Sequence, residues 1–141
     1  MPAKPSKVDL ILAVPLFRGL SRAQAHQVAR LADEVEVRAG KRLATLGETG
    51  RELFIIVEGT AAVRTPRGRT IRLSPGEFVG EMSLLDGGPR SADVEALTDM
   101  RLLVIGQRDF WSLLETAPQI ARQIMRTLSA RLREAEQQVT A

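Results

Sequence analysis

The sequence has no cysteine, no tyrosine and only one histidine, His26. The absence of cysteine excludes disulfides and thiol chemistry, and it favours a reducing compartment. With one histidine and no cysteine, the side chains that most often hold zinc are almost missing. No pair of carboxylates and no nucleophile with a neighbouring base stands out as a motif. We therefore expect a chain without catalytic activity, without a metal site and without a cofactor.

Long apolar runs are also missing. No segment reaches the roughly 18 uninterrupted apolar residues that a membrane-spanning helix needs. The apolar stretch at residues 10–17 is short and contains Pro15, whereas a secretory signal needs a longer apolar core and a cleavage site. We predict a soluble, cytoplasmic protein that does not enter a membrane.

Aromatic residues make up 4% of the chain, whereas hydrophobic residues make up 44%. The core must therefore consist mainly of Val, Ile, Leu and Ala, and 141 residues fit one domain. The net charge of +3 permits an anionic ligand but does not require nucleic acid. No recognition helix and no platform of interleaved aromatic residues is visible, so nucleic acid is not an expected partner.

The sequence before Val35 predicts one helix. Residues 1–7 are polar and contain proline, and we expect them to form a loose tail. Ser21 and Gln24 have the spacing of a capping box, in which each side chain binds the backbone N–H of the other residue, so a helix should begin there.

From Val35 onward, short β-rich runs alternate with turns that contain glycine. Many short strands at spacings near ten residues are typical of an antiparallel sandwich or jelly roll. The runs are residues 35–38, 42–46, 53–57, 60–65, 69–73, 90–96 and 101–105.

The last part of the chain is helical again. Residues 107–116 are amphipathic, and Pro118 suits the first turn of a closing helix over residues 118–138. That helix carries one apolar stripe, with residues every third or fourth position. Its members are Ile120, Ile124, Leu128, Leu132, Ala135 and Val139. The expected fold is mainly β with flanking helices: a single domain, residues 1–141, in which an N-terminal helix precedes an antiparallel β-roll or jelly roll and two C-terminal helices follow it.

Residues 78–92 combine several groups that suit one anionic ligand. Gly80 allows close backbone approach, and Glu81 is a carboxylate that can only accept hydrogen bonds. Residues 82–85 can form one helical turn whose first amides face an anion. Arg90 supplies a planar fork of donors that suits a phosphate, and Ser91 adds a hydroxyl. A ligand that matches this set carries an anionic phosphate beside a hydroxyl, as a cyclic nucleotide does.

The same segment closely resembles the phosphate-binding cassette of cyclic nucleotide-binding domains. Its pattern, F-x-G-E followed by a short apolar turn and R-[S/T/A]-A, reads Phe78-Val-Gly-Glu through Pro89-Arg-Ser-Ala92. The family includes bacterial catabolite activator-type regulators, kinase regulatory subunits and nucleotide-gated channels. The resemblance extends over residues 15–138. Residues 52–59 are similar to the family's strand and turn before the pocket, and residues 128–134 are similar to the family's closing helix.

The resemblance implies a role for each residue of the cassette. Glu81 is expected to accept the ribose 2′-hydroxyl, and Arg90 is expected to pair with the cyclic phosphate. The other groups around ribose and phosphate are expected to be Gly80, Met82, Ser91 and Ala92. An alternative to ligand binding is that Glu81 and Arg90 form a salt bridge with each other that has only a structural role.

The base site departs from the family pattern. Val63 and Leu73 are expected to line an apolar floor, and the last helix is expected to cover the base. In bacterial regulators a Thr-Ser pair on this helix contacts adenine, whereas this chain has Ala135-Glu136 there. Base recognition is therefore expected to use Arg131 or a wetter contact. By resemblance, serine at position 91 favours cyclic AMP, with cyclic GMP as the alternative ligand.

The sequence thus predicts a non-catalytic sensor of a cyclic nucleotide that signals by movement of its last helix. The stripe from Ile120 to Val139 is free to pack on its own roll, on a second copy or on another protein. Two alternatives stay open: a degenerate roll that serves as a protein-interaction module, and the sensor fragment of a larger transcription regulator or channel.

Overall fold

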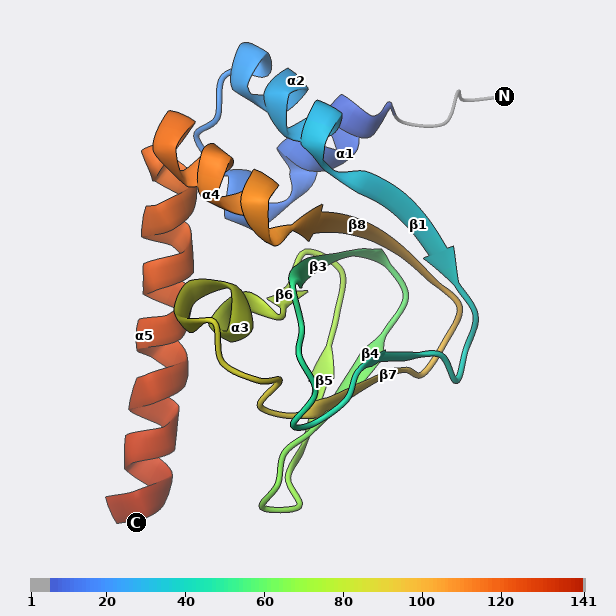
Figure 1. Cartoon of the computed structure of the whole chain (residues 1–141), viewed down its shortest axis with the longest axis vertical. Helices are drawn as coiled ribbons and strands as arrows, with labels where there is room; N and C mark the ends of the chain where they lie inside the picture. Colours follow the sequence, from blue (N-terminus) through green and yellow to red (C-terminus); the bar gives the residue numbers. More distant parts are fainter. Residues whose placement is uncertain (1–5, 141) are drawn as a thin grey trace.

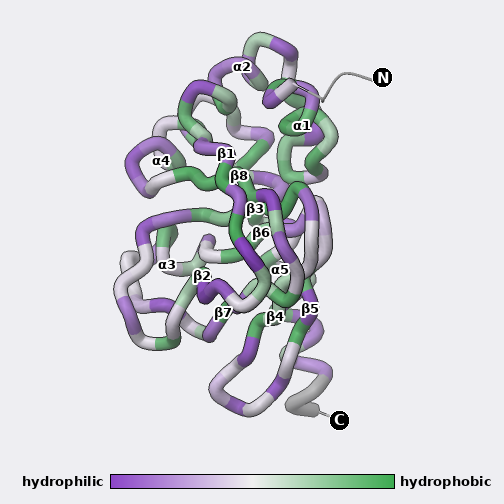
Figure 2. The backbone as a smooth tube through the Cα atoms, turned by 90° about the vertical axis from the view of Figure 1, so that its right-hand side faces the viewer, coloured by the Kyte–Doolittle hydropathy of each residue, from purple (hydrophilic) through white to green (hydrophobic). Residues whose placement is uncertain are grey.

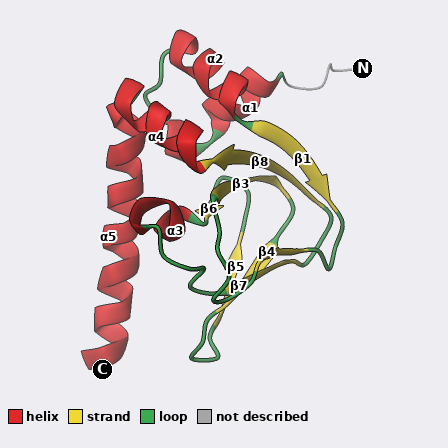
Figure 3. Cartoon of the chain, in the orientation of Figure 1, coloured by secondary structure: helices red, strands yellow, loops and turns green. Residues whose placement is uncertain are grey.

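Two four-stranded antiparallel sheets form a roll, with helices above it and along its left side in Figures 1 and 3. The computed structural model describes residues 6–140, with side chains over residues 6–137. The strand orders are β1–β8–β3–β6 and β2–β7–β4–β5. The strands are β1 (Asp33–Val37), β2 (Arg42–Ala44), β3 (Glu52–Glu58), β4 (Ala61–Arg64), β5 (Thr70–Leu73), β6 (Phe78–Val79), β7 (Asp93–Ala96) and β8 (Met100–Gly106). The predicted antiparallel β-roll with flanking helices is confirmed.

Helices precede, interrupt and follow the roll. They are α1 (Lys7–Ala13), the 3₁₀ turn η1 (Pro15–Phe17), α2 (Arg22–Leu31), α3 (Glu81–Asp86), α4 (Gln107–Thr116) and α5 (Pro118–Thr140). The predicted capping box at the start of α2 is confirmed, because the Ser21 hydroxyl accepts from the Gln24 amide at 3.1 Å and the Gln24 side chain accepts from the Ser21 amide at 3.0 Å.

The N-terminal region contains more helix than the sequence predicts. Of the residues expected in a loose tail, 1–5 lie outside the described part of the chain, whereas Ser6 caps α1 and Lys7 begins it. Ser6 and Asp9 form a second capping box, and Val8 and Ile11 are buried. The expectation of a single N-terminal helix was therefore wrong, because a short apolar segment with an S-x-x-D start forms a helix once it packs against the roll.

Two differences between predicted and observed strands concern the predicted site. The run expected over residues 90–96 forms a strand only at 93–96, since the Arg90 backbone bonds instead to Glu48 and Gly47 in the β2–β3 loop. The two-residue strand β6 was not expected, and it pairs with Phe54 and Ile55 of β3. This pairing carries the chain directly into α3, where the predicted site begins.

The strands β3 and β8 separate two apolar clusters. Ile55 and Leu103 face the helices, in a cluster that includes Phe17, Phe110 and Ile120. Their neighbours along the strands, including Ile56, Leu102 and Val104, face the interior of the roll in a second cluster. Because successive side chains of a strand point to opposite faces, strands covered on both sides are mainly hydrophobic, as the green stretches near β3 and β8 in Figure 2 show.

Only the first half of α5 belongs to the core. Ile120 and Ile124 are buried, Leu128 is half-buried and Leu132 is 61% exposed, while the Val139 side chain lies outside the described residues. The predicted stripe is therefore not buried along its whole length, because α5 runs beside the roll and then past α3 toward the free end of the chain (Figure 1). Within the described residues, no helix combines the length and apolar character required to cross a membrane.

Candidate functional site

A cavity of about 900 Å³ opens between the roll, α3 and α5. Most of the residues that the sequence predicts for the site line it: Val63, Leu73, Glu81, Met82, Arg90, Ser91, Ala92 and Arg131. Gly80 lies at its edge as the N-cap of α3. The cavity thus brings together residues that lie far apart in the sequence. They come from β4, β5, α3, the loop before β7 and α5.

Gly80 is required by the backbone at the start of α3. Its φ of 101° lies in the left-handed region that glycine adopts easily. A Cβ atom there would also come within 2.6 Å of the Glu52 carbonyl oxygen and 2.6 Å of Arg90 Nη1. The residue therefore turns the chain into α3 and leaves room for the guanidinium group beside it.

Glu81 is the first residue of α3, and only 2% of its surface is exposed. Its carboxylate accepts a hydrogen bond from Arg131 of α5. The same guanidinium donates to the Phe78 carbonyl at 3.1 Å and lies 5.4 Å from the centre of the Phe78 ring. One arginine thus ties α5 to β6 and α3 across the cavity.

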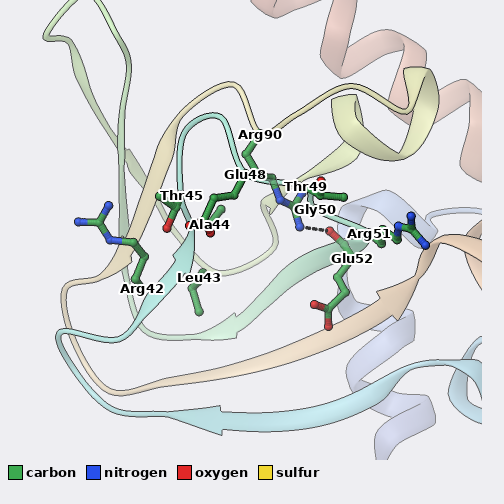
Figure 4. A pocket seen from close by; sticks show the side chains of 10 residues that line it. All are labelled: Arg42, Leu43, Ala44, Thr45, Glu48, Thr49, Gly50, Arg51, Glu52 and Arg90. Carbon is green, nitrogen blue, oxygen red and sulfur yellow. Dashed lines mark hydrogen bonds between the residues drawn. The ribbon is translucent and has the colours of Figure 1, made fainter.

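Arg90 occupies a narrow space between backbone groups and an aromatic ring. It donates to the Gly80 carbonyl at 3.2 Å and to the Glu52 carbonyl at 2.9 Å, and Figure 4 shows the second bond. Its guanidinium carbon lies 5.6 Å from the centre of the Phe54 ring. Burial lowers the pKa of Arg90, and the carboxylates of Glu52 and Glu81 oppose that shift. The group remains a cation at neutral pH, as arginine does in proteins.

A salt bridge between Glu81 and Arg90, which the sequence left as a plainer interpretation, is absent. Glu81 pairs with Arg131, whereas Arg90 bonds to two carbonyl groups. The two opposite charges therefore stand in the same cavity without neutralising each other directly, and both face the space that a ligand would occupy.

The Ser91 hydroxyl lies at the cavity and donates to the Met82 sulfur at 3.9 Å. Met82 is half exposed and lies on the turn that the sequence predicts as helical. These groups add a hydroxyl and an apolar edge to the charged pair. The resulting set of groups can bind an anion next to a hydroxyl. Within residues 6–137, no group of three or more His, Cys, Asp or Glu side chains is arranged to hold a metal ion.

The sequence reasoning missed a polar stripe on α5. Gln123, Thr127 and Glu134 line the cavity together with Arg131. They recur every third or fourth position, beside the apolar stripe, so helical spacing was a signal that could have found them. Ala135, which replaces a base-contacting residue of the family pattern, also lines the cavity.

A comparison with known protein families shows which family has this sequence pattern. The profile of the cyclic nucleotide-binding domain matches residues 34–117. The chain belongs to this family. The match covers the roll and α3, and it ends where α5 begins.

Relatives of this cyclic nucleotide-binding domain include complete regulators and channels. It is 40% identical, over 84% of its length, to a cyclic nucleotide-gated potassium channel of Mesorhizobium japonicum, and it covers 33% of that protein. It is 35% identical, over 86% of its length, to the cyclic AMP receptor protein of Thermus thermophilus, and it covers 59% of it. The domain thus spans between a third and three fifths of the curated relatives named here.

Solved structures show the same fold. The crystal structure of the Thermus thermophilus catabolite activator protein superposes with a TM-score of 0.80 at 33% identity, covering 89% of this chain and 62% of that one. The N-terminal domain of a transcriptional regulator from Streptomyces coelicolor superposes with a TM-score of 0.67 at 32% identity, covering 92% of this chain and 93% of that one. The resemblance stated from the cassette is thereby confirmed.

We predict that Arg131→Ala lowers the free energy of unfolding by about 1–2 kcal/mol, because it leaves the Glu81 carboxylate buried without its cation. The Arg131 side chain is 39% exposed, so the loss should be smaller than for a fully buried pair. Urea denaturation measures the change, with Arg133→Ala, an exposed arginine of the same helix, as the matched control. Full additivity with Glu81→Gln in a double-mutant cycle would contradict the coupling.

Proposed function

We propose that this domain binds a cyclic nucleotide, with cyclic AMP preferred over cyclic GMP, and acts as a non-catalytic sensor. The observation that carries the proposal is the meeting of one buried guanidinium and one buried carboxylate, Arg90 and Glu81, in the same cavity. Both belong to the cassette that the family uses. A cyclic nucleotide offers a singly charged phosphate and a ribose hydroxyl, which suit these two groups.

In the proposed complex, Arg90 contacts the cyclic phosphate and Glu81 accepts the ribose 2′-hydroxyl. A charge-assisted hydrogen bond is stronger than a neutral one, and a buried one is screened less by water. Ser91 and the backbone of Gly80, Met82 and Ala92 complete the ribose and phosphate contacts.

For the base, we propose a site between the apolar floor, Val63 and Leu73, and the polar stripe on α5. Arg131 is the proposed base contact, since its guanidinium lines the cavity and is anchored on Phe78. The preference for cyclic AMP is supported by serine at position 91 and by the relative from Thermus thermophilus, whose name states cyclic AMP reception.

The proposed signal is a shift in the position of α5. Arg131 holds Glu81, and the proposed ribose contact uses the same carboxylate. A ligand that adds contacts to α5 in one position stabilises that position by the difference between its binding free energies for the two positions.

We further propose that the domain works in the cytoplasm as the sensor part of a larger transcription regulator or channel, as its relatives' names suggest.

Isothermal titration of the purified chain, freed of bound nucleotide, tests the proposal. Cyclic AMP, cyclic GMP and 5′-AMP are titrated in parallel. We expect one-to-one binding of cyclic AMP, weaker binding of cyclic GMP and much weaker binding of 5′-AMP, because the open phosphate has a different shape and charge. A folded sample that binds none of them would overturn the proposed function and favour a protein-interaction module.

We predict that Arg90→Ala weakens binding of cyclic AMP by about 2–4 kcal/mol, since a charge-assisted contact in a water-poor site is lost. Glu81→Ala should weaken it by about 1–3 kcal/mol. Calorimetry measures both, with Arg67→Ala, an exposed arginine between β4 and β5, as the control. Parent-like affinity in either site variant would show that the site is assigned to the wrong residues.

We also propose that the exposed side of α5 pairs with a second copy of the chain. Met125 is 60% exposed and Leu132 is 61% exposed, with the half-buried Leu128 between them. The spacing of three and then four residues is that of the a and d positions of a coiled coil. Two such helices would bury these side chains against each other, which a single α5 cannot do.

Light scattering after size exclusion tests this pairing. We expect a dimer for the parent chain and a monomer for Leu132→Glu, because a carboxylate at the seam of a coiled coil is costly to bury. Leu46→Glu, which changes an exposed leucine outside α5, should leave the dimer intact. A monomeric parent chain at high micromolar concentration would exclude the pairing.

A further inference from the structure

The loop between β2 and β3 closes around Arg90. The Arg90 amide donates to the Glu48 carbonyl at 2.8 Å, and the Arg90 carbonyl accepts from the Gly47 amide at 2.9 Å. Thr49 and Pro89 form an isolated antiparallel bridge beside them. Figure 4 shows the Arg90 side chain lying along this loop, next to Gly50. The loop therefore holds the Arg90 backbone in place, and the Arg90 side chain lies beside it.

Gly50 lies directly against the Arg90 side chain. A Cβ atom at position 50 would overlap Arg90 at Nε, Cζ and Cδ. Gly50 is not among the glycines with positive φ, so its backbone conformation is open to alanine. Glycine is thus needed at this position for the space it leaves and not for its dihedral angles.

Four groups together form what we name the arginine socket: the Gly50 backbone, the Glu52 carbonyl, the Phe54 ring and the Gly80 carbonyl. Each of them lies against the Arg90 side chain, which also lines the cavity. The two carbonyl bonds use two of the five N–H donors of a guanidinium, so further donors remain for a ligand.

We propose that Gly50 is a positioning residue for the phosphate-binding arginine, and that the socket presets the direction of Arg90 before the ligand arrives. This inference rests on the proposed role of Arg90. A preset arginine loses little side-chain freedom on binding, so more of the charge-assisted contact appears as affinity. An added methyl group at position 50 pushes the guanidinium out of the socket and away from its two carbonyls.

Gly50→Ala separates the direction of the arginine from the integrity of the fold. The three atoms nearest to the added methyl group belong to a long, flexible side chain, so we expect Arg90 to move while the backbone stays in place. Gly80→Ala does not offer this separation, because its φ of 101° strains any other residue. Gly106→Ala is the matched control, since Gly106 also lacks a positive φ and a Cβ atom there meets nothing within 4 Å.

The experiment compares the affinity of the parent chain, Gly50→Ala, Arg90→Ala, the double variant and Gly106→Ala for cyclic AMP by calorimetry. We expect Gly50→Ala to weaken binding by about tenfold or more, as for the loss of one charge-assisted hydrogen bond. In the Arg90→Ala background, Gly50→Ala should have no further effect, because the side chain it displaces is gone. Gly106→Ala should bind like the parent.

A second measurement does not depend on nucleotide binding. In the nitrogen–proton correlation spectrum of the ligand-free chain, the Arg90 Nε–H signal is assigned by its absence in Arg90→Ala. Arg90 is only 6% exposed, so we expect this proton to exchange slowly with water in the parent and in Gly106→Ala. In Gly50→Ala it should shift and exchange faster.

Each outcome decides the inference. Faster exchange together with weaker binding, and no added loss in the double variant, supports the socket. An unchanged Nε–H signal in Gly50→Ala overturns it, as does the same loss of affinity in both backgrounds, which would place the effect in the loop itself. If the parent chain binds no nucleotide, the proposed function fails, while the exchange measurement still shows whether Gly50 positions Arg90.

Discussion

Glu81 and Arg90 are two buried side chains of opposite charge, and the contacts around them stabilise both in the buried position. A buried charge without a partner costs more free energy than a small domain can spare. The carboxylate has Arg131, and the guanidinium has two carbonyl groups and an aromatic ring. The two charges are therefore held separately, and Arg90 keeps donors beyond its two carbonyl bonds.

The position of these charges follows from the two central strands. Because β3 and β8 pack large side chains into two separate apolar clusters, a shift of their register would disturb the close packing of both. Strand β3 supplies the Glu52 carbonyl and the Phe54 ring, and it pairs with β6, which leads into Gly80 and α3. The same packing that stabilises the domain therefore sets where the Glu52 carbonyl and the Phe54 ring lie relative to the cassette.

The sequence was sufficient for the parts of the fold that depend on local chemistry. The capping box at Ser21, the alternation of short strands and turns, and the residues around Glu81 and Arg90 all follow from short motifs. It was not sufficient where tertiary packing decides. Helix α1 depends on burial of Val8 and Ile11, the partner of Glu81 lies 50 residues away, and the spatial need for Gly50 appears only when Arg90 lies beside it.

Helix α5 is packed into the core at its first half, where Ile120 and Ile124 are buried, whereas Leu132 is exposed. Beyond the core, Arg131 holds the helix through Glu81 and the Phe78 carbonyl. A helix rises about 1.5 Å per residue, so the arm from Ile124 to Thr140 is about 24 Å long. A rotation of about 10° around the anchored end would move the far end by about 4 Å, whereas Arg131, halfway along, would move by roughly half as much. A tilt of α5 that is small beside the core would thus be about twice as large at the last described turn of the helix as at the cavity.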